Sequence, residues 1–359
     1  MNKNIINQFK VENFRNIQPA LINFSEKINV IIGNNGNGKT NLLEAIHYLF
    51  RGKSFRKKNT FPQMLSSDCV KSEIIFNASF QKDKKDQYLS GVQNYKNGNF
   101  FLNNKKSPRC KLPMVFISPH DAFLFFNDSS FRKDKVHFLF SSLSKDYKES
   151  LSLYTKTLKQ KNSLLKGTIK ADLKLLEIYN QDLARLTCFL TKKKQEIIST
   201  VNPYLKNVFG KIFSESFNLK IQLKTNFNQL TENEIFKIFN KNTQKELILK
   251  TTINGQHKDD YVFYLDDFLA QEYASLGQLK MSYFSVLFAF IEVFYCKINE
   301  SPIVLIDDVS GELDHIRLKQ LLAFLGSINS QVFLTSANTE LFLNNKEVKI
   351  LKVSDGMFL

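Results

Sequence analysis

The sequence contains no tryptophan, only seven prolines and only four cysteines in 359 residues. The cysteines are scattered without a close pair, which argues against a disulfide framework or a zinc knuckle. The five histidines are equally dispersed, so we expect no metal site built on them. No uninterrupted apolar run approaches the roughly 20 residues that cross a bilayer, and the first residues lack the apolar segment and cleavage site of a signal peptide. We therefore expect a soluble, cytoplasmic protein with no membrane attachment.

Positive charge is in excess, with 50 lysines and arginines against 34 aspartates and glutamates and a net charge of +16. Two explanations compete. Lysine and arginine neutralise phosphates and supply most non-specific affinity for nucleic acid. The 34 phenylalanines and the lack of tryptophan, however, indicate the codon bias of an AT-rich genome, which would add lysine without any function.

The distribution of charge along the chain favours the first explanation. Residues 1–120 carry 19 basic and 7 acidic side chains, residues 121–202 carry 15 and 9, and residues 203–359 carry 16 and 18. Codon bias would spread lysine evenly, so this asymmetry predicts a basic face on the first two segments. The densest basic runs are Lys53, Arg56, Lys57 and Lys58; Lys82, Lys84 and Lys85; Lys105, Lys106 and Arg109; and Lys192, Lys193 and Lys194.

Hydrophobic periodicity divides the chain into three parts. Residues 1–120 alternate like strands around one early helix, residues 121–202 have the leucine spacing of a helical arm, and residues 203–359 return to mixed strands and helices. Among the predicted strands are 27–32, 73–80, 88–102, 114–118, 219–224, 247–253, 303–306 and 331–335, and the predicted helices include 41–50, 277–297 and 314–326.

The strongest motif is a phosphate-binding loop at 33–40, which fits G-x-x-x-x-G-K-[ST] between a predicted strand and a predicted helix. Glycine lets successive backbone N–H groups turn towards phosphate oxygens, and the helix N-terminus adds partial positive charge. We predict that Lys39 reaches the β- and γ-phosphates of ATP and that Thr40 ligates Mg²⁺. The predicted cofactor-binding residues here are Gly33, Asn34, Asn35, Gly36, Asn37, Gly38, Lys39, Thr40 and Asn41.

An acidic pair follows the apolar run 303–306, which predicts a fully buried strand ending at Asp307. A carboxylate at the carboxyl end of this strand suits Mg²⁺, usually through water, because a hard cation prefers oxygen ligands. Asp308 is placed to orient or deprotonate an attacking water. Asp307 is therefore a predicted metal residue together with Thr40, and Asp308 is a predicted catalytic residue together with Lys39.

A Ser-x-Gly-Gln sequence opens the helix predicted at 277–297, with Gly277 placed 30 residues before Asp307. It resembles the signature motif of ATP-binding-cassette (ABC) ATPases, and Ser275, Gly277 and Gln278 are predicted to contact nucleotide. A second helix N-terminus is a second anion-binding element, but one chain cannot easily offer both to the same γ-phosphate. The resemblance implies that the signature of one protomer completes the nucleotide site of another.

Beyond these motifs, the sequence resembles the RecF family of bacterial recombination-repair ATPases, whose heads resemble those of SMC proteins. The matching segments run through most of the chain and are 13–16, 33–40, 53–56, 255–260, 274–280, 305–314 and 331–335. The chain departs from the family signature, which reads Ser-Gln-Gly-Gln-Gln-Arg, at Leu276, Leu279 and Lys280. The family's Gly-Pro-His-Arg segment is Gly-Gln-His-Lys here.

The resemblance implies an α/β fold, an ABC-type P-loop ATPase head with an inserted α-helical arm. The head would have a mixed β-sheet core with flanking helices and an N-terminal antiparallel β region. We expect residues 1–120 to form the N-terminal part of the head, residues 121–202 the arm, and residues 203–359 the C-terminal part of the head.

The same resemblance implies an ATP-dependent DNA-binding protein of recombinational repair and replication-fork recovery. ATP would clamp a homodimer on DNA at single-strand/double-strand junctions, and slow, weakly DNA-stimulated hydrolysis would release it. RecR and RecO would be loading partners.

We consider three alternatives, and the sequence argues against the first two. A transporter motor subunit would carry a histidine after the last core strand, near Thr335. A nuclease of the overcoming-lysogenization type would need a further domain after Asp314, where 45 residues follow. An ATP-binding scaffold with decayed hydrolysis would explain the altered signature.

Overall fold

A computed structural model describes residues 2–56, 60–67, 69, 71–167, 172–309, 313–338, 342 and 347–359. The chain divides into two compact units. We call residues 1–122, 211–214 and 276–359 the head unit and residues 123–210 and 215–275 the arm unit. Lys57 and Lys58 of the predicted basic runs lie outside the described residues, as do residues 310–312 of the predicted family segment.

The head unit is built on a six-stranded sheet in the order β17-β16-β4-β15-β14-β9, which is parallel except for β17. Every residue of its central strands is buried, and parallel strands covered on both faces have such continuous apolar runs. The strands are β4 (Ile28–Ile32), β9 (Met114–Ile117), β14 (Ile303–Ile306), β15 (Val332–Ser336), β16 (Val348–Ser354) and β17 (Met357–Phe358).

A second six-stranded sheet is antiparallel, in the order β3-β2-β5-β6-β7-β8. Its strands are β2 (Ile5–Glu12), β3 (Ile22–Asn23), β5 (Glu73–Lys82), β6 (Lys85–Asn94), β7 (Gly98–Leu102) and β8 (Lys105–Ser107). Burial alternates along β5, so one face of this sheet packs on the core. The shorter elements of the head unit are β1 (Asn2–Lys3), β13 (Glu300–Ser301) and α2 (Phe61–Met64). Helix α3 (Asp121–Asn127) begins in the head unit and continues in the arm unit.

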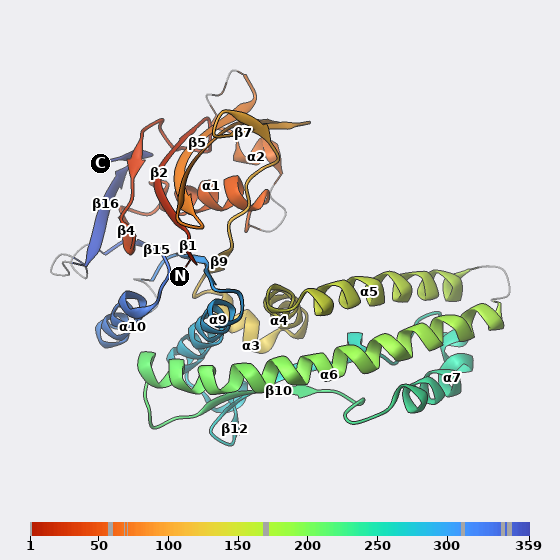
Figure 1. Ribbon diagram of the computed structural model, residues 1–359. Helices are drawn as coiled ribbons and strands as arrows, with labels where there is room; N and C mark the ends of the chain where they lie inside the picture. The colour runs from red at the N-terminus through yellow and green to blue at the C-terminus, as the bar shows by residue number, and fades with distance from the viewer. Residues whose placement is uncertain are drawn as a thin grey trace. The chain divides into compact units, whose positions relative to one another are not determined.

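Helix α1 (Lys39–Arg51) shares one hydrophobic core with both sheets of the head unit. This core includes Ile31, Leu305 and Phe333 of the parallel sheet. Helices α9 (Leu276–Ile298) and α10 (His315–Ser327) lie on the other side of that sheet (Figure 1). This arrangement confirms the predicted ABC-type head with its mixed sheet and antiparallel region.

Helix α9 is long and apolar enough to cross a membrane by length and mean hydropathy alone. Most of it is nevertheless buried in the protein, from Leu279 to Val293. The Phe288 ring packs on Phe324 of α10, with 5.1 Å between the ring centroids. We therefore regard α9 as a core helix of the head unit.

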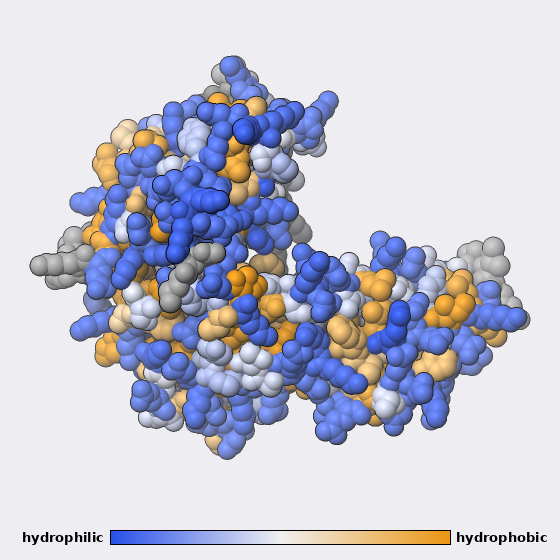
Figure 2. Space-filling view, in the orientation of Figure 1, coloured by the Kyte–Doolittle hydropathy of each residue, from blue (hydrophilic) through white to orange (hydrophobic). Residues whose placement is uncertain are grey.

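The arm unit contains long helices and a small three-stranded sheet, in the order β10-β11-β12. Buried polar contacts tie α5, α6 and α7 together, because Lys161 Nζ lies 2.6 Å from both Asn180 Oδ1 and Glu246 Oε2. Hydrophobic patches are interspersed among hydrophilic residues on the visible face (Figure 2). The elements are α4 (Ser129–Leu143), α5 (Lys145–Lys166), α6 (Leu173–Ile212), β10 (Leu219–Lys224), α7 (Glu232–Leu249), β11 (Asp260–Leu265), β12 (Phe268–Leu269) and α8 (Ala270–Tyr273).

The structure differs from the predicted end of the arm at residue 202. Helix α6 continues through Pro203 to Ile212, although proline usually ends or kinks a helix. Residues 215–275 also belong to the arm unit rather than to the head. The return of strand-like patterns after residue 203 therefore indicates the small sheet of the arm and not a return to the head.

The prediction of a strand at 247–253 is wrong. Helix α7 begins with a capping box between Thr231 and Glu234 and extends to Leu249. Ile248 is 80% exposed, so the alternation of apolar and polar residues here does not reflect two faces of a sheet.

Candidate nucleotide-binding site

The phosphate-binding loop lies where the sequence predicts it, between the carboxyl end of β4 and the start of α1. Gly36 and Gly38 have φ angles of 89° and 103°, in the left-handed region that favours glycine. A Cβ atom on Gly33 would lie 2.3 Å from the carbonyl oxygen of Val353, so this position also requires glycine. The loop thus leads into the N-terminus of α1, where N–H groups without helical partners can bind an anion.

Lys39, the first residue of α1, folds back over the loop. Its Nζ donates hydrogen bonds to the carbonyl oxygens of Gly33 and Asn34, at 2.7 and 3.0 Å. Burial lowers the pKa of Lys39, whereas the negative charges of Asp308 and Asp307 oppose this shift. The ammonium group therefore lies within electrostatic reach of both predicted acidic residues.

Thr40 and the acidic strand meet at one end of the parallel sheet. The Thr40 hydroxyl donates to the Asp307 carboxylate, with Oγ1 2.8 Å from Oδ1 and 3.0 Å from Oδ2. Thr335, at the end of β15, donates to the same Oδ1 at 2.6 Å. The start of α1 and the ends of β14 and β15 thus meet at the two residues predicted to hold the metal.

The donor set of Thr40 and Asp307 fits Mg²⁺. A hydroxyl and a carboxylate are hard oxygen ligands, and Mg²⁺ usually takes one or two carboxylates together with water and substrate phosphates. Among the described residues, no group of three or more His, Cys, Asp or Glu side chains could form a cage made by the protein alone. Thr40 and Asp307 would therefore hold the ion together with water and phosphate.

Asp308 has a φ angle of 50°, which is uncommon for a residue other than glycine. Its backbone N–H donates to Thr335 Oγ1 at 2.7 Å. The Thr335 hydroxyl therefore accepts from Asp308 while it donates to Asp307. One side chain thus positions both acidic residues, a role of Thr335 that no sequence motif predicted.

Glu44 supports the site, and no sequence motif predicted this role. Glu44, on α1, is fully buried, yet it is charged. Its carboxylate accepts hydrogen bonds from Arg15, at 2.7 Å between Nε and Oε2, and from the Ser54 hydroxyl. Arg56 Nη1 lies 3.3 Å from the same Oε2 atom. The family segments 13–16 and 53–56, which precede and follow the loop in the sequence, therefore both contact Glu44 on α1.

A chain of hydrogen bonds connects this buried cluster to the phosphate loop. Arg56 Nη2 donates to Asn41 Oδ1 at 2.9 Å, and Asn41 Nδ2 donates to Asn16 Oδ1 at 2.7 Å. Asn16 Nδ2 in turn donates to the carbonyl oxygen of Gly36 at 3.0 Å. Asn41, which the sequence predicts to bind the cofactor, thus contacts side chains that brace the loop.

The turn between β16 and β17 also holds the loop. The Gly356 N–H donates to the carbonyl oxygen of Asn37 at 3.1 Å, and the Gln18 N–H donates to the carbonyl oxygen of Gly356 at 2.9 Å. Gly356 has a φ angle of 80°, and a Cβ atom there would lie 1.7 Å from the Asn16 carbonyl oxygen. A hollow of about 740 Å³ adjoins this turn, and its lining includes Asn13, Arg15, Asn16, Gln18, Gln63 and Asp355.

The predicted signature residues lie at the start of α9. This helix begins at Leu276, so Ser275 directly precedes it, and Gly277 and Gln278 lie in its first turn. Ser275 and Gly277 are exposed and Gln278 is half-buried. The structure does not test their contact with nucleotide, which stays a prediction.

Several residues of the predicted basic runs have structural roles. Lys194 is fully buried and lies 2.7 Å from Asp259 Oδ2. Arg109 donates to the carbonyl oxygen of Tyr48 at 2.6 Å, and Arg56 belongs to the cluster around Glu44. The basic face is therefore smaller than the sequence predicts.

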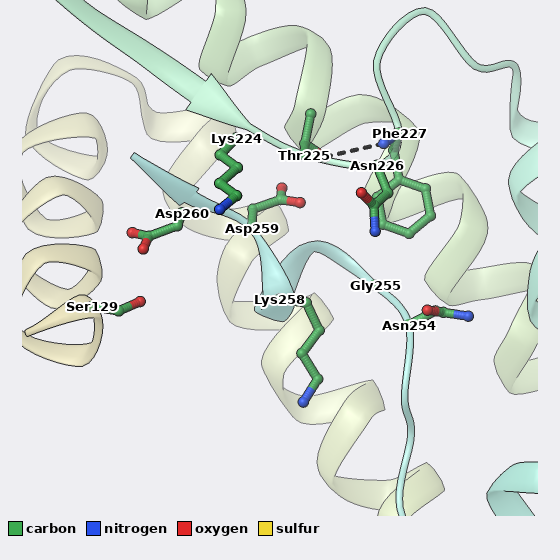
Figure 3. A pocket seen from close by; sticks show the side chains of 10 residues that line it. All are labelled: Ser129, Lys224, Thr225, Asn226, Phe227, Asn254, Gly255, Lys258, Asp259 and Asp260. Carbon is green, nitrogen blue, oxygen red and sulfur yellow. Dashed lines mark hydrogen bonds between the residues drawn. The ribbon is translucent and has the colours of Figure 1, made fainter. Parts of the chain in front are cut away.

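The family segment 255–260 lies in the arm unit and forms one buried and one partly buried ion pair. Asp260 accepts from Arg132, with 3.0 Å between Oδ1 and Nε, and Asp259 pairs with Lys194. A pocket of about 260 Å³ opens beside these carboxylates. Figure 3 shows Lys224 directed between Asp259 and Asp260. The segment joins the arm helices to β11, so its acidic residues serve the packing of the arm.

Comparison with known proteins places these features in a family. Residues 5–357 match the RecF/RecN/SMC N terminal domain. The DNA replication and repair protein RecF of Macrococcus caseolyticus is 30% identical over 371 residues, which cover 96% of each chain. RecF of Phocaeicola vulgatus is 27% identical, over 98% of this chain and 97% of the relative.

Solved structures show the same fold. The chain superposes with a TM-score of 0.81 on the recombination mediator protein RecF with ATP, of the RecFOR pathway, at 24% identity. The match covers 99% of this chain and 97% of that protein. The Smc head domain from Pyrococcus furiosus gives a TM-score of 0.58 at 12% identity, over 99% of this chain and 95% of the Smc chain.

Proposed function

Because the chain belongs to the RecF/RecN/SMC N-terminal domain family, and within it to the RecF proteins, we propose that it is an ATP-dependent DNA-binding protein of recombinational repair and replication-fork recovery. The observation that carries this proposal is the convergence of the phosphate loop, Thr40 and Asp307 at one end of the parallel sheet. A phosphate loop, a metal-binding hydroxyl and an acidic strand are the parts that NTP hydrolysis requires.

The geometry supports a division of roles among these residues. The N–H groups of the loop and of the first turn of α1 would bind the phosphates, and Lys39 would exchange loop carbonyl contacts for phosphate oxygens. Mg²⁺ held by Thr40 and Asp307 would neutralise charge that develops on the phosphates. Asp308 would orient the attacking water and accept its proton. The hollow beside the β16–β17 turn suits the nucleoside, because it is polar and adjoins the loop.

Hydrolysis would be weak and stimulated by DNA, as in a binding switch. Ser275, Gly277 and Gln278 would complete the nucleotide site of a second copy, so ATP would favour a homodimer. Lys280 replaces an arginine of the family signature and so loses the forked, bidentate contact of a guanidinium. This substitution, together with Leu276 and Leu279, would slow turnover without removing the phosphate or metal residues.

The chain would act in the cytoplasm on DNA, at junctions between single and double strands. The solved RecF relatives act in the RecFOR pathway, so RecR and RecO relatives are the proposed loading partners. The exposed lysines of the antiparallel sheet supply the positive charge that such binding needs.

An ATP-binding scaffold without hydrolysis is the second candidate, favoured by the altered signature. A transporter motor is disfavoured by Thr335, whose hydroxyl holds both acidic residues at the position where a motor carries histidine.

ATP binding and turnover separate these candidates. Lys39→Ala removes a charge-assisted contact to phosphate, so ATP affinity should fall at least about ten-fold. Asp308→Asn should retain ATP affinity but lower the hydrolysis rate by about 10² or more. Lys96→Ala, on an exposed turn of the antiparallel sheet, is the matched control and should change neither value.

The oligomeric state provides the second measurement. Sizing with ATP and Mg²⁺ should show a dimer that is lost with ADP and in Lys39→Ala. Background hydrolysis in the wild type, with and without DNA, would favour the scaffold. Failure of the wild type to bind ATP would contradict both candidates.

A further inference from the structure

The antiparallel sheet of the head unit has one face that does not belong to the core. On β5, Ile74, Phe76, Ala78 and Phe80 are buried, whereas the residues between them are only half-buried. Because successive side chains alternate across a strand, Ile75, Asn77 and Ser79 share the outward face. The neighbouring positions on β6 and β7 follow from the register, which pairs Asn77 with Ser90 and Ser90 with Phe101.

Two large aromatic side chains lie on this outward face. Tyr88 is 43% exposed and Phe101 is 40% exposed. The register pairs Ser90 with Phe101, and Tyr88 lies two residues before Ser90 on the same face. Tyr88 and Phe101 are therefore diagonal neighbours, with about 7–8 Å between their Cα atoms. The Tyr88 hydroxyl donates to Asn77 Oδ1 at 2.7 Å, which fixes the ring without covering it.

A hollow of about 550 Å³ adjoins Phe101 on this face. Its outward lining combines apolar side chains, which suit a flat ring, with amide and hydroxyl groups that can bond to base edges. One lysine stands at its border. The residues are Ile75, Asn77, Ser90, Val92, Phe101 and Lys106.

The charge of the surrounding strands is positive. Residues 73–111 carry eight basic and three acidic side chains, a net charge of +5. The lysines of the β5–β6 turn, Lys84 and Lys85, are exposed, as are Lys105 and Lys106 of β8. This charge complements a polyanion, whereas an apolar protein partner would not require it.

We propose that this outward face, formed by β5 to β8, binds single-stranded DNA by stacking bases on Tyr88 and Phe101. Lys106 and the neighbouring lysines would contact the phosphates. Base stacking on aromatic side chains along a basic surface is the general mode of single-strand binding. A duplex would not use the rings, because its bases are stacked on each other. The proposal rests on the proposed DNA-binding function and adds a site that is separate from the nucleotide.

Fluorescence anisotropy with labelled oligo(dT) and with a duplex of the same length tests the proposal. The double variant Tyr88→Ala, Phe101→Ala should bind oligo(dT) at least about ten-fold more weakly, because bases can no longer stack on the two rings. Duplex binding should change by less than about three-fold, since the basic side chains remain. The variant Tyr88→Phe, Phe101→Tyr keeps both rings and should bind oligo(dT) like the wild type.

Two controls keep the result specific. Phe138→Ala removes an aromatic ring of similar exposure, 42%, from the arm unit and should leave oligo(dT) affinity unchanged. ATP affinity should be unchanged in every variant, which shows that the head unit is folded. Photocrosslinking of the wild type to 5-iododeoxyuridine oligonucleotides should label the peptides that contain Tyr88 and Phe101.

The outcomes separate this proposal from the proposed function. Wild-type oligo(dT) affinity in the double alanine variant, or crosslinks only outside residues 73–111, would overturn the stacking face while DNA binding stands. An equal loss of duplex and oligo(dT) affinity would also overturn it, because stacking would not explain the duplex. Wild-type protein that binds neither DNA would overturn the proposed function itself.

Discussion

Replacing Glu44 with alanine tests whether the buried cluster behind the phosphate loop stabilises the head unit. The Glu44 side chain is 0% exposed, and its partners Arg15 and Arg56 are 18% and 35% exposed. Removing one partner of a buried ion pair costs about 3–5 kcal/mol, because the other charge stays buried. Since Arg56 can recover water, we expect the lower end, a loss of about 3 kcal/mol in the free energy of unfolding.

The variant should also weaken ATP binding, although Glu44 does not form part of the loop. Without its carboxylate, Arg56 loses the contact that holds it against Asn41, and the hydrogen bonds through Asn16 to Gly36 lose their anchor. We expect several-fold lower ATP affinity at a temperature where the variant is folded. Glu44→Gln keeps the shape and the acceptor oxygen, so it should fall between the wild type and Glu44→Ala in both measurements.

Urea unfolding followed by circular dichroism and titration with a fluorescent ATP analogue measure these effects. Glu12→Ala is the matched control, because Glu12 pairs with Lys10 at 2.8 Å on the surface, with 30% and 36% of the side chains exposed. Surface pairs contribute about 1 kcal/mol or less, so this control should be nearly neutral. A loss below about 1 kcal/mol in Glu44→Ala would refute the reasoning.

Three further predictions test other parts of the structure. Gly356→Ala should lower both stability and ATP affinity, measured in the same assays, because its Cβ would lie 1.7 Å from the Asn16 carbonyl oxygen; unchanged values would contradict the role of this turn. Asp259→Asn should destabilise the arm unit by about 3 kcal/mol, because Lys194 loses its buried partner, while ATP affinity stays at the wild-type value. Burial lowers the pKa of His47 to about 4. In the unfolded chain this imidazole has its ordinary pKa of about 6.5, so it takes up a proton at a higher pH than in the folded chain. The free energy of unfolding should therefore decrease by about 2 kcal/mol between pH 7.5 and 5 because of His47 alone. His47→Gln should show a flatter pH dependence in urea unfolding, and an equally steep one would contradict this cause.

The parallel sheet and its loop were predictable because their signals are local. A continuous apolar run, a glycine-rich turn and an amphipathic helix follow one another within residues 27–50, and each sets its own backbone. Asp307 follows a strand that is distant from the loop in sequence, yet the order of the motifs along the chain predicted that the two would form one site. The structure confirms that the Thr40 hydroxyl reaches this carboxylate.

The support of the site was not predictable, because it depends on contacts between distant segments. Glu44 is a charged residue within the helix 41–50, and on an isolated helix such a side chain would face water. Only the approach of Arg15 and Arg56 explains why it is buried. The sequence offered one signal of this support, which is that Arg15 precedes the loop and Arg56 follows it. Both lie in segments that were identified only by their resemblance to the family.

The arm shows a different reason for failure. We predicted that the arm ends at residue 202, directly before Pro203, but α6 continues through this proline to Ile212. Proline usually ends or kinks a helix, so the packing of the helix outweighs this local rule here. Lys194 counted towards a basic surface because its sequence neighbours are also lysines. Its burial against Asp259 depends on the fold of residues 255–260, which are distant in sequence.

The hydroxyl of Thr335 links the two acidic residues of the proposed site. It has a single hydrogen atom, which it donates to Asp307, while its oxygen receives the N–H of Asp308. A cation that draws Asp307 towards itself must either break the first bond or move Thr335, and a movement of Thr335 also moves the backbone of Asp308. If Asp307 holds the metal and Asp308 activates the water, as proposed above, metal loading would be coupled to the placement of the second carboxylate over these two hydrogen bonds. The chemical step would then follow loading of the metal and nucleotide without a rearrangement of whole helices or strands.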